Sequence, residues 1–322
     1  LLGVYGLSLL VLLAGALLPR WRIGLPGLAL LLAAGAGLRT VAWSTAVGEP
    51  VAVALVQGNI PQSLKWQPEQ FLRTLFLYRD LVERHPAQLS VLPETALPAF
   101  FDQLPPDFIA ELKRLARRRD GDLILGVPSG AGERYWNSAV TLGASPLQTY
   151  SKIHLVPFGE FIPPGFAWFM ALARIPMSEF SRGPEDQAPL HLGGRRVAVN
   201  ICYEDAFGAD LRRALPEAEI LINLSNTAWF GDSLAQPQHL QISALRALET
   251  GRPMLRATNT GMTAVIAPDG RVRAVLPAFT RGVLEAEVRG YQGMTPYARW
   301  GDAPFLLLAA ALLLGARWRR RR

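Results

Sequence analysis

Long apolar runs at both ends of the chain limit most strongly what it can fold into. Residues 1–18 and 23–43 are almost wholly apolar, with Arg39 near the end of the second run, and residues 303–316 form a third. Runs of about 18–20 apolar residues suit the hydrocarbon core of a bilayer. We therefore expect two transmembrane helices within residues 1–44. A third, within residues 302–322, is short and needs local thinning of the bilayer or snorkelling arginines.

The first apolar run does not have the features of a secretory signal peptide. No basic segment precedes it, it has no clear small-residue cleavage site, and a second apolar run follows it. The chain also does not begin with Met. We expect a fragment that begins inside a larger multi-span protein, with residues 1–44 as the C-terminal part of a membrane domain.

The basic excess of the chain lies beside these apolar runs. The formal net charge is +7, from 33 lysines and arginines against 26 acidic residues. Seven of these 33 bases flank the apolar runs, namely Arg20, Arg22, Arg317 and Arg319–Arg322. The other 26 equal the acidic residues in number. This distribution is typical of the positive-inside rule and not of a phosphate-binding face. It predicts that residues 45–301 lie opposite the cytoplasm, in the periplasm of a Gram-negative bacterium.

Between the apolar runs, short β-branched segments alternate with amphipathic ones. Strands are expected at residues 52–60, 89–92, 123–127, 136–142, 149–153, 196–201, 220–224, 254–258, 263–267, 272–275 and 283–288. Helices are expected at residues 68–84, 105–119, 207–214 and 237–250. Several strands are joined by tight turns, such as Asp269-Gly270. The pattern favours a mixed sheet, or two packed sheets, with helices outside.

The only cysteine in the chain, Cys202, directly follows a predicted buried strand. One cysteine cannot form an internal disulfide, so Cys202 is either a buried apolar residue or a nucleophile. Its position at the end of a strand, where side chains turn into a cleft, favours the nucleophile. A thiol that must stay free in an oxidising compartment is also safer when the chain holds no second cysteine.

Two other reactive side chains occur at strand ends. Glu94 follows Leu-Ser-Val-Leu-Pro, and Lys152 lies within Tyr-Ser-Lys-Ile-His. A charged group at the mouth of an apolar strand is unfavourable unless it meets a partner or water. Taken singly, Glu94 is also compatible with a surface acid and Lys152 with a solvated lysine. If the three strands are neighbours in one sheet, their ends converge and both residues meet Cys202.

These three segments resemble the Glu-Lys-Cys triad of the nitrilase, or carbon-nitrogen hydrolase, superfamily. The chain is further similar to the apolipoprotein N-acyltransferase family through QGNIPQSLKW, LPETALP, SKIHLVPFGEFIP, ICYED, SNTAWFGD and LRATNTG. The resemblance covers about Val51 to Val288. It implies an α/β fold, a nitrilase-like α-β-β-α sandwich flanked by transmembrane helices, with residues 45–301 as the periplasmic catalytic domain. The family normally carries more transmembrane helices before this domain, which fits the expected fragment.

The resemblance also implies a ping-pong acyl transfer at the inner membrane. Cys202 takes a fatty acyl chain from a phospholipid as a thioester, and the α-amino group of the diacylglyceryl-cysteine of an apolipoprotein then accepts it. Glu94 acts as the base. Lys152 stabilises the oxyanion and helps to hold the thiolate, and the backbone N–H of Tyr203 is a second oxyanion donor.

Further residues enter the site through the same resemblance. Glu160 and Glu204 are expected to position Lys152 or the amine, although both also fit surface acids. Trp66 and Tyr203 are expected to contact the acyl chain, although both also fit core aromatics. Weaker candidates, better explained by a structural role, are Asn226, Trp229 and Asn137.

A loop rich in proline and glycine, residues 154–165, runs into an aromatic segment that contains Phe166, Trp168 and Phe169. This segment either packs on the domain or forms an arm that enters lipid or covers an apolar substrate. The four histidines lack metal-ligand spacing, and the chain has no phosphate loop or dinucleotide motif. We therefore predict no metal, no cofactor and no nucleic-acid partner.

Two other interpretations compete with the acyltransferase. A membrane-anchored amidase or nitrilase-type hydrolase would use the same triad, with water as the second acceptor. A hydrolase of this kind would act on a small polar substrate, and the apolar arm and the expected transmembrane helices argue against such a substrate. A non-catalytic membrane scaffold belongs to a different class, and the presence of all three triad residues argues against it.

Overall fold

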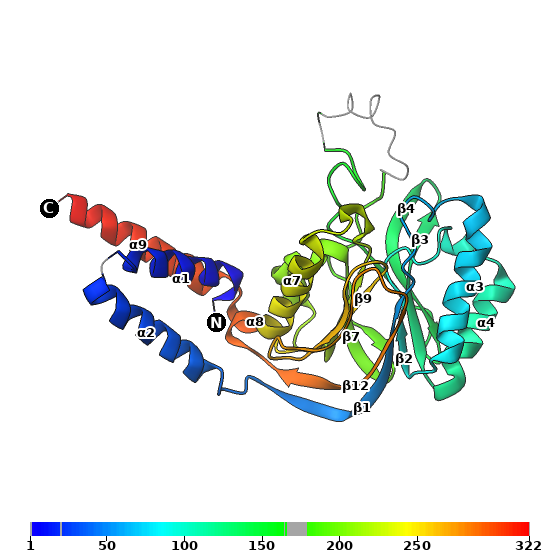
Figure 1. Cartoon of the computed structure of the whole chain (residues 1–322), viewed down its shortest axis with the longest axis horizontal. Helices are drawn as coiled ribbons and strands as arrows, with labels where there is room; N and C mark the ends of the chain where they lie inside the picture. Colours follow the sequence, from blue (N-terminus) through cyan, green and yellow to red (C-terminus); the bar gives the residue numbers. More distant parts are fainter. Residues whose placement is uncertain (1, 20, 164, 166–178, 322) are drawn as a thin grey trace.

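The computed structural model of the chain describes residues 2–19, 21–163, 165 and 179–321. The expected aromatic arm with Phe166, Trp168 and Phe169 lies outside the described residues. Two sheets pack face to face between outer helices, and three helices from the two ends of the chain extend together from one side of this body (Figure 1).

The first sheet is mixed and has the strand order β12-β1-β2-β3-β4-β5. Its parallel centre, β1 to β3, continues into an antiparallel pair of β3 with β4, and β12 lies antiparallel to β1 at the other edge. The strands are β1 (Ser44–Gln57), β2 (Leu89–Val91), β3 (Asp122–Ala131), β4 (Arg134–Gly143), β5 (Thr149–Ser151) and β12 (Gly282–Gly293).

The second sheet repeats this design with the order β11-β10-β9-β8-β7-β6. Strands β7, β8 and β9 are parallel, and antiparallel hairpin partners flank them on both sides. The strands are β6 (Leu190–Leu192), β7 (Arg195–Ile201), β8 (Ile220–Ser225), β9 (Met254–Thr258), β10 (Thr263–Ile266) and β11 (Val272–Leu276).

Helices cover the outer face of each sheet. Helices α3 (Pro68–Arg84) and α4 (Pro106–Ala116) lie on the first sheet, with a proline in the first turn of each, where no N–H is missed (Figure 1). Helix α7 (Ala235–Thr250) lies on the second sheet beside the short α6 (Gly208–Arg213), and α8 (Pro296–Trp300) follows β12. Short 3₁₀ turns are η1 (Phe101–Gln103), η2 (Arg117–Arg119), η3 (Cys202–Ala206) and η4 (Ala228–Phe230).

Three apolar clusters hold these layers together. The largest lies between the sheets and takes alternate residues of both, such as Leu55 and Val91 from the first and Val199, Ile222 and Leu255 from the second. Two others lie between each sheet and its helices. This layering confirms the α-β-β-α sandwich expected from the resemblance.

Three of the differences between the structure and the sequence-based expectations concern the sheets. Strand β1 begins at residue 44 and not 52, because its exposed first half pairs with an equally long β12 across a register shift between Val47 and Val51. Strand β6, which no segment predicted, is a three-residue edge strand paired with β7. The strands before Glu94, Lys152 and Cys202 are not neighbours in one sheet, because β2 and β5 belong to the first sheet and β7 to the second.

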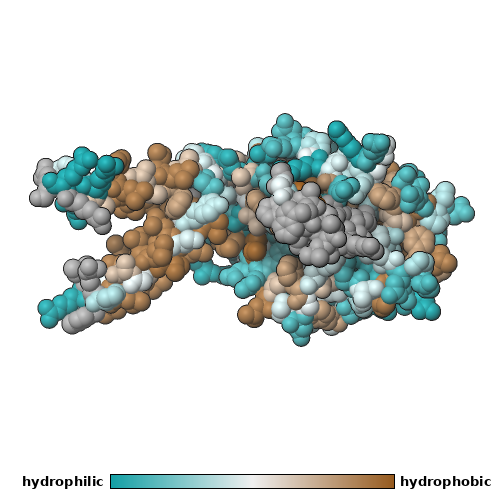
Figure 2. All heavy atoms as spheres, turned by 90° about the horizontal axis from the view of Figure 1, so that it is seen from above, coloured by the Kyte–Doolittle hydropathy of each residue, from teal (hydrophilic) through white to brown (hydrophobic). Residues whose placement is uncertain are grey.

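The terminal helices α1 (Gly3–Leu17), α2 (Trp21–Leu38) and α9 (Ala303–Arg320) occupy the segments expected to span a membrane. Hydrophobic side chains gather over these helices, whereas hydrophilic ones dominate the rest of the visible face (Figure 2). Within the part of the chain that the structure describes, no helix meets the combined length and hydropathy needed to cross a bilayer. The expected spans are therefore not confirmed.

The layered core predicts a large effect of truncating a side chain between the sheets. Leu55→Ala removes a fully buried side chain of β1 and should lower the free energy of unfolding by about 2–5 kcal/mol. Leu147→Ala, at a position that is 60% exposed, is the matched control and should change it by less than about 0.5 kcal/mol. Denaturant unfolding of the two variants measures both values, and equal effects would contradict the assigned inter-sheet core.

Candidate active site

Glu94 enters the gap between the sheets from the loop that follows β2. The loop passes so close to β3 that a Cβ atom at Gly126 would lie 2.4 Å from the carbonyl oxygen of Pro93 and 2.5 Å from the Cα of Glu94. Only a glycine at position 126 allows this approach. The next residue, Thr95, has a positive φ of 47°, which turns the chain away and leaves the Glu94 carboxylate in place. Backbone packing therefore fixes this carboxylate.

Lys152 follows β5 and places its ammonium between two carboxylates. Its Nζ lies 3.1 Å from Oε1 of Glu94 and 2.9 Å from Oε1 of Glu160, and all three side chains are buried. Asn137 on β4 donates from the same Nδ2 to Glu94 at 2.8 Å and to Glu160 at 2.7 Å. Val156 N donates to the remaining oxygen of Glu160. The ammonium and the amide thus hold the two carboxylates in one orientation.

The charges in this cluster keep it ionised despite burial. Burial opposes ionisation of Glu94, but the Lys152 charge and the hydrogen bonds from Asn137 and Lys152 hold the pKa of Glu94 below its usual value. Burial likewise opposes the charge on Lys152, but Glu94, Cys202 and Glu160 raise the pKa of its ammonium well above the usual value. At neutral pH Glu94 and Lys152 therefore form a buried ion pair, and Glu160 contacts the same ammonium.

Cys202 stands at a sharp backbone turn where β7 ends and η3 begins. Its φ is +58°, a left-handed conformation that a residue with a Cβ rarely adopts and that costs about 1–3 kcal/mol. Two side chains hold its carbonyl: Asn223 Nδ2 donates to it at 2.8 Å, and His239 Nε2 lies 3.3 Å away. The turn leaves Cys202 half-buried at the end of the strand.

A buried polar network supports this turn from the outer face of the second sheet. Asn200, Asn223 and Arg256 lie side by side in the register of β7, β8 and β9. Asn223 donates to Asn200 and accepts from Arg256 Nη1 at 2.7 Å. Asp205 accepts from Ser243, and its other oxygen lies 3.0 Å from His239 Nε2. The backbone conformation of Cys202 thus depends on three strands and α7 together.

The thiol of Cys202 is protonated in the resting site. Burial is the main reason that the pKa of the thiol rises to about 12, and the negative charge of Glu94 raises it further. The positive charge of Lys152 lowers this pKa, but by less. Lys152 thus favours the thiolate, but burial, together with the neighbouring carboxylates, outweighs its effect. Proton transfer from the thiol must therefore accompany attack on a substrate.

Tyr203 and Glu204 both bind the backbone of the segment that follows Lys152. The Tyr203 hydroxyl donates to Leu155 O at 2.8 Å, and Nζ of Lys152 lies 5.7 Å from the centre of its ring. The hydrogen bonds that Glu204 accepts from described residues come from the N–H groups of residues 153, 154 and 201 and from the Tyr150 hydroxyl. Glu204 therefore ties the end of β7 to the chain after Lys152, and not to the ammonium itself.

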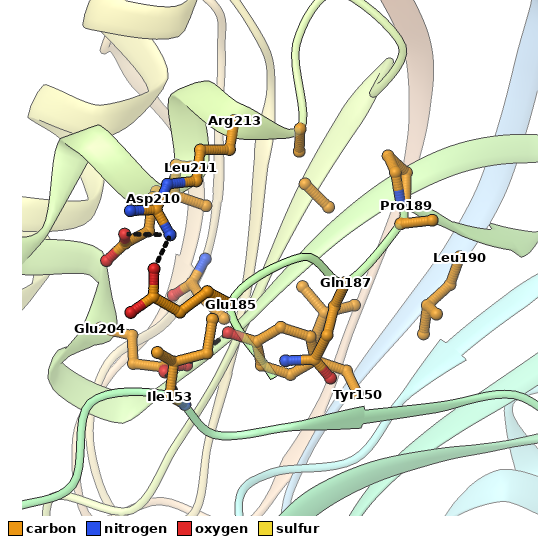
Figure 3. Close-up of a pocket in the computed structure, with 15 residues that line it drawn as sticks. Tyr150, Ile153, Glu185, Gln187, Pro189, Leu190, Glu204, Asp210, Leu211 and Arg213 are labelled. Atoms are coloured by element: carbon orange, nitrogen blue, oxygen red, sulfur yellow. Dashed lines mark hydrogen bonds and ion pairs between the residues drawn. The ribbon is translucent and has the colours of Figure 1, made fainter. Parts of the chain in front are cut away.

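Glu204 also borders a small cavity beneath the site. This cavity has a volume of about 40 Å³, and Tyr150, Gln187 and Asp210 line it beside Glu204 (Figure 3). The Tyr150 hydroxyl points at the Glu204 carboxylate from the floor of the cavity. Burial raises the pKa of Glu204, although its backbone hydrogen bonds oppose that rise. The volume suits one or two waters and no larger ligand.

Three predicted residues remain, of which Asn226 is buried and Trp66 and Trp229 are exposed. The backbone N–H of Asn226 donates to Oε2 of Glu94 at 2.8 Å, and its side chain bonds to Gln62 and Asn259. Trp66 is 43% exposed and Trp229 is 70% exposed, so neither is a core aromatic. Asn226 therefore orients the Glu94 carboxylate, and the two tryptophans lie at the surface, each close in sequence to a residue that contacts Glu94.

Lys65 belongs to the site although its charge was not considered in the sequence analysis. It is 2% exposed, and its Nζ lies 3.4 Å from the carbonyl oxygen of Glu94. Its position between Leu64 and Trp66 in an irregular loop gave no periodicity from which burial could be predicted. In the described part of the chain, no group of three or more His, Cys, Asp or Glu side chains is arranged to hold a metal ion.

Comparisons with known proteins give the family of the chain. The model of the carbon-nitrogen hydrolase family matches residues 52–297. A relative from Nitrosomonas europaea named apolipoprotein N-acyltransferase is 49% identical over 97% of this chain and 65% of its own length. One of the same name from Ralstonia nicotianae is 46% identical over 100% of this chain and 64% of its own length. The chain thus spans about 65% of the length of these relatives.

Solved structures show the same fold at lower identity. An amidase of the nitrilase superfamily from Nesterenkonia superposes with a TM-score of 0.57 at 21% identity, over 75% of this chain and 92% of the amidase. A carbon-nitrogen hydrolase from Helicobacter pylori gives a TM-score of 0.57 at 20% identity, over 74% of this chain and 89% of its own. These likenesses support the architecture and leave the reaction open.

The ion cluster predicts a pH-dependent loss of stability in Lys152→Met. The variant buries Glu94 and Glu160 without their cation and should lose about 3–5 kcal/mol of unfolding free energy at pH 7. Burial then raises the pKa of Glu94 above its unfolded value, so the folded state gains relative stability as pH falls toward 4.5. The wild type should show the opposite trend for Glu94, because its lowered pKa stabilises the fold above the unfolded value of 4.5, and this stability is lost as the pH falls below that value.

Thermal and urea unfolding of Lys152→Met at pH 7 and 4.5 test this sign. Lys113→Met, at an exposed position of α4, is the matched control with the same substitution and should be nearly neutral at both pH values. A destabilisation of Lys152→Met that grows toward pH 4.5 would contradict the assigned charge states.

Proposed function

The chain belongs to the carbon-nitrogen hydrolase family, and we propose that it moves a fatty acyl chain from a phospholipid to the α-amino group of the diacylglyceryl-cysteine of apolipoproteins. The observation that carries the proposal is the similarity to proteins named apolipoprotein N-acyltransferase along nearly the whole chain. The gathering of Glu94 and Lys152 next to Cys202 supports it, because a base, a cation and a thiol are what acyl transfer through a thioester needs.

The first half of the reaction forms an acyl-enzyme. Glu94 takes the proton of the Cys202 thiol while the sulfur attacks the ester carbonyl of the phospholipid, and Lys152 balances the negative oxygen that develops. The backbone N–H of Tyr203 is proposed as the second donor to that oxygen. The carbon–oxygen bond of the ester then breaks, Glu94 returns its proton to the leaving alkoxide, and a lysophospholipid departs.

The second half transfers the acyl chain to nitrogen. The neutral α-amine attacks the thioester carbonyl, Glu94 takes a proton from the nitrogen, and the carbon–sulfur bond breaks as the amide forms. The same proton then returns to the Cys202 sulfur, so that the site regains its resting state. One carboxylate thus serves as base and acid in both halves.

The membrane setting is part of the same proposal. We place residues 1–44 and 302–322 as segments of a membrane domain at the bacterial inner membrane, and residues 45–301 as the catalytic domain facing the periplasm. The positive charge beside the terminal runs and the hydrophobic cover of the terminal helices support this placement (Figure 2). The exposed Trp66 and Trp229 are proposed to contact the acyl chain, since large apolar side chains at a site mouth favour apolar ligands.

A membrane-anchored amidase or hydrolase remains the second candidate. The match to the carbon-nitrogen hydrolase family favours it, because water could replace the amine in the second half with the same triad. The two functions differ in one product: the hydrolase releases a free fatty acid, whereas the transferase leaves the acyl chain on a peptide nitrogen.

We predict that Cys202 gains one acyl mass when the purified protein is incubated with phospholipid. Intact-protein mass spectrometry should detect the adduct in the wild type and not in Cys202→Ala. Glu94→Gln, which keeps shape and removes the base, should slow acylation by roughly 10²–10⁴-fold. Persistence of the adduct in Cys202→Ala would refute the nucleophile.

Addition of an acceptor then distinguishes the two candidates. A synthetic diacylglyceryl-cysteine lipopeptide with a free α-amine should discharge the acyl-enzyme and gain the acyl mass, whereas the N-acetylated lipopeptide should not. Discharge at equal rates with both peptides, together with release of free fatty acid, would favour the hydrolase.

A further inference from the structure

We propose that Lys65 is a positioning residue of the site, a second buried cation that offsets the paired carboxylates and favours the ionised forms of Glu94 and Cys202. Nothing in the triad chemistry requires this lysine. It reaches the site from the loop before α3, and its ammonium lies 3.4 Å from the carbonyl oxygen of Glu94. With 2% exposure, its charge is turned into the protein and not toward solvent.

The charge balance of the site explains why a second buried cation is favourable beside Glu94. Glu94 and Glu160 are both ion-paired to the single ammonium of Lys152, which leaves one negative charge in excess. Arg256 does not remove this excess, because its own ion pair is with Asp205 on the far side of Cys202. A thiolate or an oxyanion formed at Cys202 would add a further negative charge. A second ammonium beside Glu94 makes the cluster neutral before the reaction starts.

The groups that face Lys65 are Glu94 and Cys202, with Lys152 and Glu160 behind Glu94 and Arg256 behind Cys202. Burial lowers the pKa of Lys65 to about 8, although Glu94 and Cys202 both act to raise it. Lys65 is therefore mostly charged at pH 7 and mostly neutral at pH 9. Lys152 and Glu94 do not change state in this interval, because the pKa of Lys152 lies well above it and that of Glu94 below it. The Cys202 thiol, with its pKa raised to about 12, stays protonated.

This titration predicts a signature in the reactivity of Cys202 itself. The probe is iodoacetamide, which is neutral: the sulfur–carbon bond forms, the carbon–iodine bond breaks, and the thiol proton is lost to Glu94 or solvent. The inference requires Cys202 to be reactive and is independent of the acyl donor and acceptor, so its failure is distinguishable from failure of the proposed function. We expect the plot of log alkylation rate against pH to bend downward near pH 8, where the charge on Lys65 is lost.

Three variants of the full chain separate the charge of Lys65 from its shape. Lys65→Met removes the charge and should slow alkylation at pH 7 by about tenfold, the effect of about one pKa unit on the thiol, and should remove the bend. Lys65→Arg restores a charge that does not titrate in this range, so it should recover rate relative to Lys65→Met and also show no bend. Lys113→Met is the matched control on exposed α4 and should keep the bend.

Circular dichroism and thermal unfolding report whether Lys65→Met is folded, and the wild-type pH profile stands without it. A wild-type profile with no bend would overturn the proposal. So would a bend that persists in Lys65→Met, or an alkylation rate of folded Lys65→Met equal to that of the wild type at pH 7. A bend present in the wild type and in Lys113→Met, and absent from both Lys65 variants, would support it.

Discussion

The site depends on one buried ion cluster, the Lys152 ammonium between Glu94 and Glu160. Charges removed from water are strongly unfavourable unless they are paired and hydrogen-bonded, so each of the three side chains requires the other two. Because they come from the loops after β2 and β5 and from the following Pro/Gly-rich loop, the cluster also fixes these loops relative to one another. Asn137 on β4 completes it by donating to both carboxylates. The ion pairs that stabilise these loops are therefore the same contacts that fix the positions of the proposed catalytic side chains.

The second sheet contributes Cys202, the proposed nucleophile, at a left-handed backbone turn. The left-handed backbone of Cys202 is unfavourable by itself, and it persists because Asn223 and His239 hold its carbonyl. Glu204 adds a link in the other direction, from the end of β7 to the backbone after Lys152 in the first sheet. The two halves of the site are thus joined by a buried carboxylate that belongs to neither the base nor the nucleophile.

Much of this arrangement could be predicted from the sequence, and the rest could not for physical reasons. Period-two and helical patterns located most elements because burial on one face imposes those periods. Strand β6 was missed because only its pairing with β7 defines its three residues as a strand. That Glu94 and Cys202 reach the site from different sheets could not be predicted either, since local pattern does not encode which strands pair. Lys65 escaped notice because irregular loops carry no pattern that signals burial.

The charge state of Cys202 explains why the carboxylate must lie beside it. Because burial raises the pKa of the thiol to about 12, formation of the thiolate at pH 7 is strongly unfavourable. A free thiolate is therefore scarce, which also protects a solitary cysteine from stray oxidants. The cost falls only when the negative charge moves from sulfur to an oxygen held by donors while Glu94 keeps the proton. Burial thus keeps the thiol protonated and unreactive in the resting site, and the thiol reacts only when a substrate carbonyl is bound.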